Sequence, residues 1–240
     1  MNIGVIGCGT IASATVHGIA QDGHQITVSE RSESHAKALA EAYENVSNAS
    51  NQGVVDSSDV IFLGLMAELA PKILGSLKFR EGQRIITFMA GATLDQTDEM
   101  VHPACATAIM MPFPGIARGG TPVMMQGDAD LVRDIFCTRN SVYSLKSSDE
   151  MAAYLCAQAV LSPVARMVSD AAEWLGERGA DRVQGEAFLR ELVASNLSEI
   201  ECGPLIEALN APGGYNQRLR LHMEASGMGE ALRAGLKDLE

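Results

Sequence analysis

The first thirty residues constrain the fold of this chain more than any other stretch. Residues 2–6 are mostly apolar and run into Gly7-Cys8-Gly9-Thr10-Ile11-Ala12, a G-x-G-x-x-A sequence. A segment with helical spacing follows, and a second strand-like stretch, 25–29, ends at Glu30. Strand, glycine turn, helix, strand and terminal acid, in this order, are typical of the dinucleotide-binding unit of a parallel α/β sheet.

Each residue of this turn has a physical role in the predicted site. Gly7 allows the tight turn out of the strand, Gly9 lets the backbone approach a pyrophosphate, and Ala12 lets the helix lie close to the sheet. The first helical N–H groups, at Thr10 and Ile11, face the phosphates with the positive end of the helix dipole. The alternative is a glycine-rich turn that serves packing only.

The end of the second strand bears on the choice of cofactor. A carboxylate at Glu30 can bond the ribose hydroxyls of NAD and would repel a 2′-phosphate. Arg31 and Ser32, which follow it directly, could instead bind the 2′-phosphate of NADP. We therefore expect both NAD and NADP to be accepted.

Charge and composition exclude several classes of protein. The formal net charge of the 240 residues is −12, and the sequence contains no basic cluster. Both features argue against nucleic acid or an anionic membrane as a partner. No uninterrupted apolar run reaches the ~18 residues of a membrane span, and the N-terminus lacks the basic leader of a signal peptide.

The cysteines and histidines favour a reducing compartment and no metal. The five cysteines are odd in number and form no C-x-x-C pair, and the five histidines are scattered. This pattern is typical of free thiols in the cytoplasm rather than of a disulfide framework or a zinc site. We expect a cytoplasmic protein without a metal ion.

Strand-like and helical stretches alternate through the first 146 residues. The near-continuous apolar run 59–65 is typical of a parallel strand buried on both faces. This alternation predicts an α/β fold with a Rossmann-like doubly wound sheet. The strands are expected at 2–6, 25–29, near 46, and at 59–65, 84–89, 107–111, 122–126 and 141–145. The helices are expected after Gly9 and at 31–43, 68–77 and 128–136, with a short one after the capping box 93–96.

The pattern changes at residue 147, so we expect a dinucleotide-binding domain over 1–146 and an all-helical domain over 147–240. A second capping box, 147–150, precedes a helical stretch, 151–175, that is apolar nearly all round. Such a helix is normally buried, and Pro163 predicts a kink within it. Further helices are expected at 182–200, 203–209 and 215–239. So small a domain cannot cover the long helix on every side, which predicts a homodimer.

Four stretches together resemble the pyrroline-5-carboxylate reductase family. They are Ile3–Ala12, Met89–Leu94, Met111-Pro112-Phe113-Pro114 and Ala211–Asn216, in the family's order and at similar spacing over nearly the whole chain. The Pro-Gly-Gly of the last stretch is the most specific. The resemblance implies a Rossmann domain, a helical C-terminal domain that builds a dimer, and reduction of a cyclic imine by hydride transfer from a nicotinamide cofactor.

The resemblance also implies the residues of the site. Ser162 and Asn216 are the expected catalytic groups. Beyond the first motif, the expected cofactor contacts are Gly64, Leu65, Met66, Ala90 and Gly91. The expected substrate contacts are Pro112, Pro114, Ser162, Tyr215 and Asn216.

The chain departs from the family where a small amino-acid carboxylate would bind. Leu65-Met66-Ala67 replaces a V-K-P sequence, and Ala159-Val160-Leu161 replaces the serines and glycine of the kinked helix. Tyr215 and Asn216 replace two threonines. These changes remove hydroxyl donors, so the expected substrate is an imine that is bulkier or less acidic than pyrroline-5-carboxylate.

Some residues also fit roles without function. Ser162 could bond the carbonyl one turn back in its helix, and Asn216 could cap a helix. Arg118 lies in a glycine-flanked loop, where a solvated side chain competes with an anion site.

Other functions fit the same motifs. A β-hydroxyacid dehydrogenase is less suitable, because 151–175 lacks the lysine usual there, and a deazaflavin-linked dehydrogenase is a further rival. A non-catalytic, redox-sensing dinucleotide-binding protein is the alternative from another class.

Overall fold

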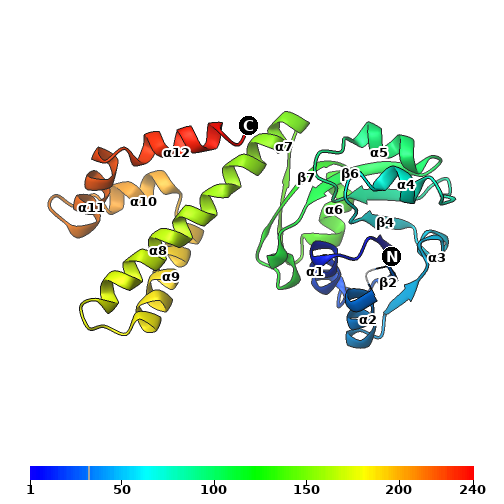
Figure 1. The fold of residues 1–240 in the computed structure, drawn as a ribbon, viewed down its shortest axis with the longest axis horizontal. Helices are drawn as coiled ribbons and strands as arrows, with labels where there is room; N and C mark the ends of the chain where they lie inside the picture. Colours follow the sequence, from blue (N-terminus) through cyan, green and yellow to red (C-terminus); the bar gives the residue numbers. More distant parts are fainter. Residues whose placement is uncertain (32) are drawn as a thin grey trace. The chain divides into compact units, whose positions relative to one another are not determined.

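The computed structural model describes residues 1–31 and 33–240 and divides the chain into two compact units, Met1–Met151 and Ala152–Glu240. The first unit combines a sheet with helices, and the second is all helical (Figure 1). Sequence patterning places the change of architecture between 146 and 147. The boundary between the units falls inside α7 (Ser148–Ala157), whose first residues pack on the first unit through the buried Met151.

The first unit contains one sheet with the strand order β3-β2-β1-β4-β5-β6-β7-β8. Neighbouring strands run parallel, except that β6 and β7 are antiparallel. Strand order reverses between β1 and β4, as in a doubly wound sheet, so the predicted fold class is confirmed. The strands are β1 (Asn2–Ile6), β2 (Gln25–Ser29), β3 (Val46–Ala49), β4 (Val60–Leu63), β5 (Arg84–Thr87), β6 (Cys105–Met111), β7 (Pro122–Gly127) and β8 (Ser141–Ser144).

Helices cover both faces of this sheet because its central strands are apolar on both sides. Phe62 of β4 belongs to the core on the face of α1 (Thr10–Ile19), α2 (Glu33–Ala42) and α6 (Ala129–Phe136). The neighbouring Leu63 belongs to the opposite core, which is shared by α3 (Asn51–Ser57), α4 (Ala70–Leu74) and α5 (Leu94–Val101). Each apolar cluster excludes water from one face of the strands that carry the site.

A helix begins where the sequence predicts it when a local capping residue fixes its first turn. Thr93 and Gln96 form the predicted capping box of α5. The second box differs: Ser147 Oγ accepts from the Glu150 N–H at 3.1 Å, but the Glu150 carboxylate accepts from the Lys146 N–H at 2.6 Å, one residue before the N-cap. Helix α3 is not predicted by the pattern, and Ser50 caps it by accepting from the Gly53 N–H.

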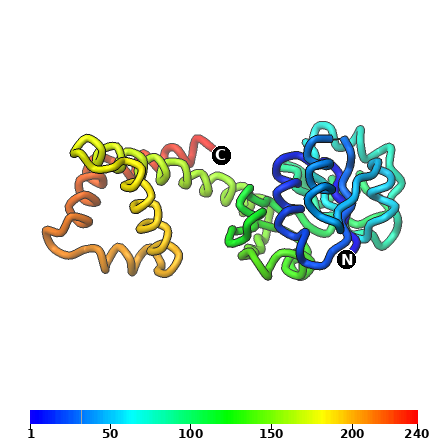
Figure 2. The backbone as a smooth tube through the Cα atoms, turned by 90° about the horizontal axis from the view of Figure 1, so that it is seen from below, coloured from blue at the N-terminus to red at the C-terminus, as the bar shows by residue number. Residues whose placement is uncertain are grey.

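The second unit contains only helices after α7. Shortly before Pro163, where the sequence predicts a kink, the structure contains the 3₁₀ turn η2 between two α-helices. The C-terminal helix returns to the end of α7, where Cys156 Sγ lies 3.5 Å from the carbonyl oxygen of Leu239 (Figure 2). The remaining elements are η2 (Gln158–Val160), α8 (Leu161–Gly176), α9 (Arg182–Glu199), α10 (Cys202–Ala208), α11 (Tyr215–Ala225) and α12 (Met228–Lys237).

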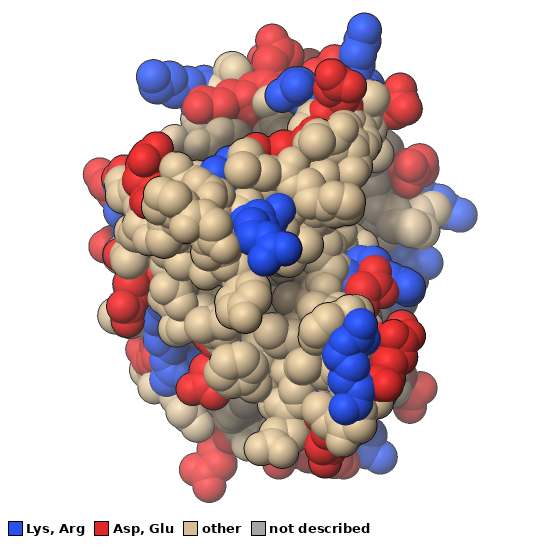
Figure 3. Space-filling model, turned by 90° about the vertical axis from the view of Figure 1, so that its left-hand side faces the viewer, with Lys and Arg blue, Asp and Glu red and all other residues tan. Residues whose placement is uncertain are grey.

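Residues 151–175 are expected to be buried, and in the single chain most of this stretch is exposed. Only Met151 and Ala172 of that stretch are buried, whereas Leu161 is 72% exposed and Trp174 is 53% exposed. A broad uncharged surface lies in the middle of the face shown in Figure 3, with charged side chains mostly around it. The apolar character of the helix therefore needs a cover that one chain does not supply.

Although no uninterrupted apolar run of the ~18 residues of a membrane span is present, the helical stretch Ser148–Gly176 is long and apolar enough to be a candidate membrane span. It is 29 residues long with a mean hydropathy of 1.3 in its most apolar window, only 6% of which is buried. Length and composition alone would allow it to cross a membrane. Helices that pack in a protein interior have the same composition, so this measure does not separate the two.

Candidate functional site

The two glycines of the first turn, Gly7 and Gly9, are needed for different physical reasons. Gly7 has φ +87°, and a Cβ there would lie 2.5 Å from the carbonyl oxygen of Gly64, so the fold itself requires glycine. Gly9 has an extended backbone with φ −81°, and a Cβ there would meet no atom of the described residues within 4 Å. The fold does not require glycine at position 9, and its missing side chain keeps open the space in front of the turn.

Hydroxyl groups at two strand ends hold the turn and its neighbour in place. Ser29, the last residue of β2, accepts a hydrogen bond from the Gly7 N–H at 3.0 Å. Thr87, the last residue of β5, accepts one from the Met89 N–H at 3.1 Å. Both are fully buried. Neither is among the predicted site residues, although a hydroxyl residue directly before a loop at a strand end is a signal that sequence reasoning could use.

The N-terminus of α1 is prepared for an anion. No side chain in the described part of the chain caps it, and its first turn contains no acidic residue. The N–H groups of Thr10, Ile11 and Ala12 meet no acceptor among the described residues, whereas the Ser13 N–H already bonds Gly9 O at 2.8 Å. These free donors at the positive end of the helix dipole fit a phosphate group.

Cys8 lies inside the turn but offers no reactive group. Its side chain is fully buried, and burial raises the pKa of its thiol to about 11. At neutral pH the thiol is therefore protonated, so it packs rather than attacks or binds a metal. Within residues 1–31 and 33–240, no group of three or more His, Cys, Asp and Glu side chains could hold a metal ion.

The expected ribose contacts follow β2, which pairs with β1. Glu30 and Arg31 are both exposed, and the Glu30 N–H donates to the carbonyl oxygen of Ala49 at 3.1 Å, which fixes the strand end. Ser32 lies outside the described residues. The carboxylate is thus free to turn toward a ribose at the same edge of the sheet as the glycine turn.

The other expected cofactor residues follow β4 and β5 at that same edge. Gly64 and Leu65 are partly buried against the turn, and Met66 is 64% exposed. Ala90 and Gly91 are exposed, and Gly91 has φ +79°. The carboxyl ends of β2, β1, β4 and β5 therefore bring all the described residues of the predicted cofactor site to the point where the strand order reverses, which is where ligands bind in such sheets.

The turn after β6 is apolar and lies at the same edge of the sheet as the end of β5, because β6 runs parallel to β5. Pro112 is partly buried, Pro114 is exposed, and the short helix η1 (Pro114–Ala117) follows. Arg118 comes after it and is exposed. Its neighbour Ile116 packs against Gly18, near the C-terminal end of α1, so Arg118 is not placed at the phosphate turn.

The remaining predicted residues belong to the second unit, and their surroundings remove two alternatives. Ser162 is exposed in the first turn of α8 and makes no hydrogen bond with a described residue, so it is not bonded one turn back. Asn216 is exposed and does not cap α11, whose N-cap is Gly214 without a side-chain bond. Instead, the side chain of Gln217 accepts from the Gly213 N–H at 2.8 Å. Tyr215 is 88% exposed.

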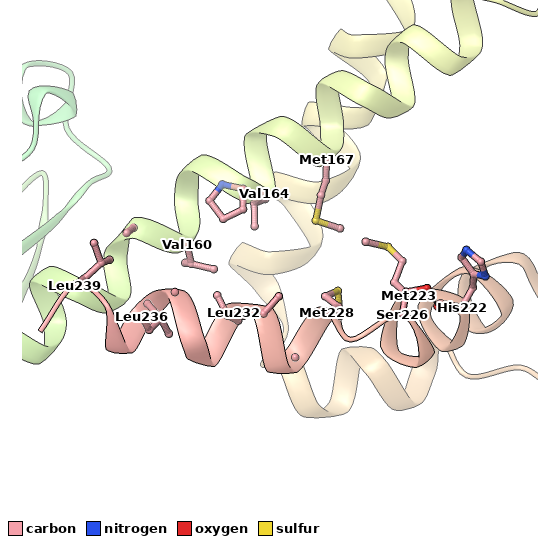
Figure 4. Close-up of a pocket in the computed structure, with 15 residues that line it drawn as sticks. Val160, Val164, Met167, His222, Met223, Ser226, Met228, Leu232, Leu236 and Leu239 are labelled. Carbon is pink, nitrogen blue, oxygen red and sulfur yellow. Dashed lines mark hydrogen bonds between the residues drawn. The ribbon is translucent and has the colours of Figure 1, made fainter.

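The same unit contains an apolar groove of about 860 Å³ between α8 and the C-terminal helices. Val160 and Val164 point toward α12, which contributes Leu232 and Leu236, and Met167 points toward Met223 of α11 (Figure 4). An adjoining groove of about 700 Å³ contains Trp174 and Phe188 and shares Met167 with the first. Their lining is almost entirely apolar, which does not suit an anionic small molecule.

A family model and one relative each match part of the chain. A family model described as NADP oxidoreductase, coenzyme F420-dependent, matches residues 2–91. A pyrroline-5-carboxylate reductase of Corynebacterium melassecola is 27% identical over 162 residues, which are 61% of this chain. The match spans 60% of that protein's own length.

Solved structures match the chain over both units. The 1-pyrroline-5-carboxylate reductase of Streptococcus pyogenes has a TM-score of 0.79 at 23% identity and covers 100% of this chain and 96% of that chain. The pyrroline carboxylate reductase of Plasmodium falciparum, solved with NADP bound, has a TM-score of 0.80 at 16% identity and covers 100% of this chain and 95% of that one. An imine reductase from Pseudomonas sp. has a TM-score of 0.65 at 18% identity, and the match covers 99% of this chain and 87% of that chain.

At these identities the solved structures establish the fold, and the match with the bacterial reductase adds a similarity in sequence. The comparisons therefore confirm the resemblance to the pyrroline-5-carboxylate reductase family, in sequence over 162 residues and in fold over the whole chain.

Proposed function

We propose that the protein is an NAD(P)H-dependent reductase that transfers a hydride to the carbon of a C=N bond in a small imine. The observation that carries the proposal is the open space at Gly9 in front of an uncapped α1, at the switch point of the sheet. Relatives in the same fold include reductases whose names state NADP and imine reduction. NADP or NAD is accordingly the proposed cofactor.

The residues of the chain orient the reactants. The bound nicotinamide would supply the hydride. The N–H groups of Thr10 and Ile11 would hold the pyrophosphate, and the exposed Met66 would give the nicotinamide an apolar contact at the end of β4. An imine that is already protonated in water needs no strong enzymic acid. Ser162 and Asn216, which are exposed and unbonded, would orient it by hydrogen bonds.

The substrate of this reaction is proposed to lack a tightly bound carboxylate. The strand ends around the cofactor site carry apolar Leu65, Met66 and Phe113, and the described residues 64–67, 88–93 and 111–117 contain no lysine or arginine. An anion buried without donors loses hydration that nothing replaces. The absence of two charge-assisted bonds, each about 1.5–3 kcal/mol, weakens binding by about two to four powers of ten. We therefore propose a bulkier or less acidic imine than pyrroline-5-carboxylate.

The test is NADPH oxidation with a panel of cyclic imines that differ in size and in the presence of a carboxylate. We expect apolar imines to be turned over with a higher kcat/KM than pyrroline-5-carboxylate, and Ser162→Ala and Asn216→Ala to reduce that turnover. Efficient conversion of pyrroline-5-carboxylate that is insensitive to both variants would contradict the substrate and the site together. Cofactor binding without turnover of any panel member would favour the redox-sensing alternative.

A further prediction concerns the cofactor. We expect Glu30→Ala to raise the affinity for NADP relative to NAD, because the carboxylate that repels the 2′-phosphate is lost while the exposed Arg31 stays. Fluorescence titration with NADPH and NADH checks this ratio, and Glu33→Ala, in the first turn of α2, is the control for a general charge effect. A shift toward NAD would show that the two roles are reversed.

We also propose that the functional protein is a cytoplasmic homodimer joined through the second unit. In that unit only Ala172 and Leu205 are buried in the single chain. A helical unit of this size with so little buried surface is not stable alone. The five free cysteines fit a reducing compartment.

A further inference from the structure

A polar network surrounds the turn between α10 and α11, outside the two apolar grooves of the second unit. Gln217 accepts from the Gly213 N–H at 2.8 Å and donates to the carbonyl and side-chain oxygens of Asn210, at 3.3 and 3.1 Å. Arg220 donates to the same Asn210 side-chain oxygen at 2.8 Å, and its guanidinium pairs with Glu224 at 2.7 Å. The Asn210 side chain is thus the common acceptor of two donors.

The network fixes the backbone of an exposed turn rather than a buried core. Gly213 has φ +74°, and the Gly214 N–H closes the turn onto the carbonyl oxygen of Ala211 at 2.9 Å. Side-chain hydrogen bonds that each contribute about 1 kcal/mol join the two ends of the turn, and Gln217 and Arg220 are held on the following helix. The turn therefore has one preferred conformation.

What the turn presents is unusual for a protein surface. Tyr215 and Asn216 follow it directly; the tyrosine is 88% exposed, and the amide caps nothing. An exposed aromatic ring and an amide that bonds no described residue are groups that binding sites use, and a backbone that is already fixed loses less conformational entropy when they meet a ligand.

We propose that Asn210, Gln217 and Arg220 are positioning residues that hold Tyr215 and Asn216 in the orientation that receives the imine. This inference rests on the proposed function and extends it, because it assigns substrate affinity to three residues that do not touch the substrate. The three side chains form a polar clamp, defined as Asn210, Gln217 and Arg220, and the clamp acts through the Pro212–Gly214 turn.

The experiment compares Gln217→Met and Asn210→Leu, which keep side-chain size but remove the bonds, with Asn210→Asp, which keeps an acceptor for both donors. Gln184→Met is the matched control, because Gln184 lies in the first turn of α9, and its side chain bonds no described residue. The readouts are KM and kcat with the best imine, the affinity of the NADP-loaded dimer for the corresponding saturated amine by calorimetry, the Kd for NADPH, and hydrogen exchange of the Gly213 amide.

We expect Gln217→Met and Asn210→Leu to raise KM and the amine Kd about tenfold, the ratio that corresponds to one or two lost hydrogen bonds. The kcat, the Kd for NADPH and the dimer mass should stay near wild type. Asn210→Asp should recover most of the affinity, and Gly213 exchange should rise only where the bonds are lost.

Faster Gly213 exchange with an unchanged KM and amine Kd would show a merely structural network and overturn the proposal. Equal losses of NADPH binding or of dimer mass would overturn it as well. Amine binding is measured without turnover, so the two proposals separate. A wild-type protein that binds the amine but reduces no imine would contradict the proposed function, while the clamp is still judged by the amine affinities of the variants. A wild-type protein that binds no amine would overturn the clamp.

Discussion

Gly9→Val is expected to lower dinucleotide affinity by at least about 100-fold while the protein stays folded. The backbone at Gly9 is extended, which suits a β-branched residue, and the added Cβ meets no atom within 4 Å in the described part of the chain. The valine methyl groups would instead occupy the space where a pyrophosphate must come close to the N–H groups of α1. The loss is then a loss of ligand contact and not of stability.

The neighbouring glycine provides the contrast. Gly7→Ala should destabilise the fold, because the left-handed backbone and the Gly64 carbonyl oxygen at 2.5 Å both oppose a Cβ there. Gly203→Val is the matched control, since a Cβ at Gly203 also meets open space, but in the helical unit. Titration with NADPH fluorescence and thermal unfolding of all three variants separate the effects. An unchanged NADPH titration in Gly9→Val would remove the basis of the cofactor assignment.

Most elements of the first unit, with the exception of α3, can be predicted from the sequence because local signals decide them. Strands such as β1 and β2 have the predicted bounds, and Thr93 caps α5 as its pattern indicates. The order of strands and helices then limits the topology, because parallel strands joined by helices have few arrangements. The fold and the candidate phosphate turn therefore follow from the amino-acid pattern alone.

Features that depend on distant partners do not follow from that pattern. The buried hydroxyl of Ser29 matters only because β2 pairs with β1 and so comes within 3.0 Å of the Gly7 N–H. Gln217, not Asn216, binds the turn before α11, because its longer side chain reaches Asn210 and Gly213 together. One position along a helix changes the direction of a side chain by about 100°, which a sequence motif alone does not resolve.

The hydropathy of 151–175 correctly indicates a surface that needs cover, but it does not locate that cover. The expectation is a buried helix that one chain cannot cover on every side, and Leu161 and Trp174 are indeed exposed in the single chain. Composition reports that water is unfavourable at a surface and contains no information on what excludes the water. A second copy, a membrane and another protein would leave the same pattern in the sequence.

A second copy of the chain is the occupant that we expect, and Leu232→Glu should break the assembly. Leu232 lies in the groove between α8 and α12 and is 41% exposed in the single chain. Covering the exposed part of its side chain in a dimer would contribute about 1 kcal/mol per subunit, and a buried unpaired carboxylate in its place costs several kcal/mol more. The dimer contains the groove twice, so the dissociation constant should rise by at least about 1,000-fold.

Sedimentation over a range of concentrations measures this shift, and the single tryptophan gives an independent signal. Trp174 is 53% exposed in the adjoining groove, so its emission should shift to shorter wavelength as the wild-type protein associates and should not do so in Leu232→Glu. Tyr143→Glu, with a 49% exposed side chain on β8 of the first unit, is the control for added charge and should leave the dimer intact.

Other outcomes of these measurements would show that something other than a second copy of the chain buries the apolar surface of the second unit. A stable wild-type monomer of 25.5 kDa at micromolar concentration would refute the dimer. If Trp174 emission shifted only on addition of neutral phospholipid vesicles, the exposed helix Ser148–Gly176 would be a membrane-binding element instead. The expected result is association without lipid, because the apolar residues are spread over two grooves and several helices rather than along the one helix that a bilayer would need.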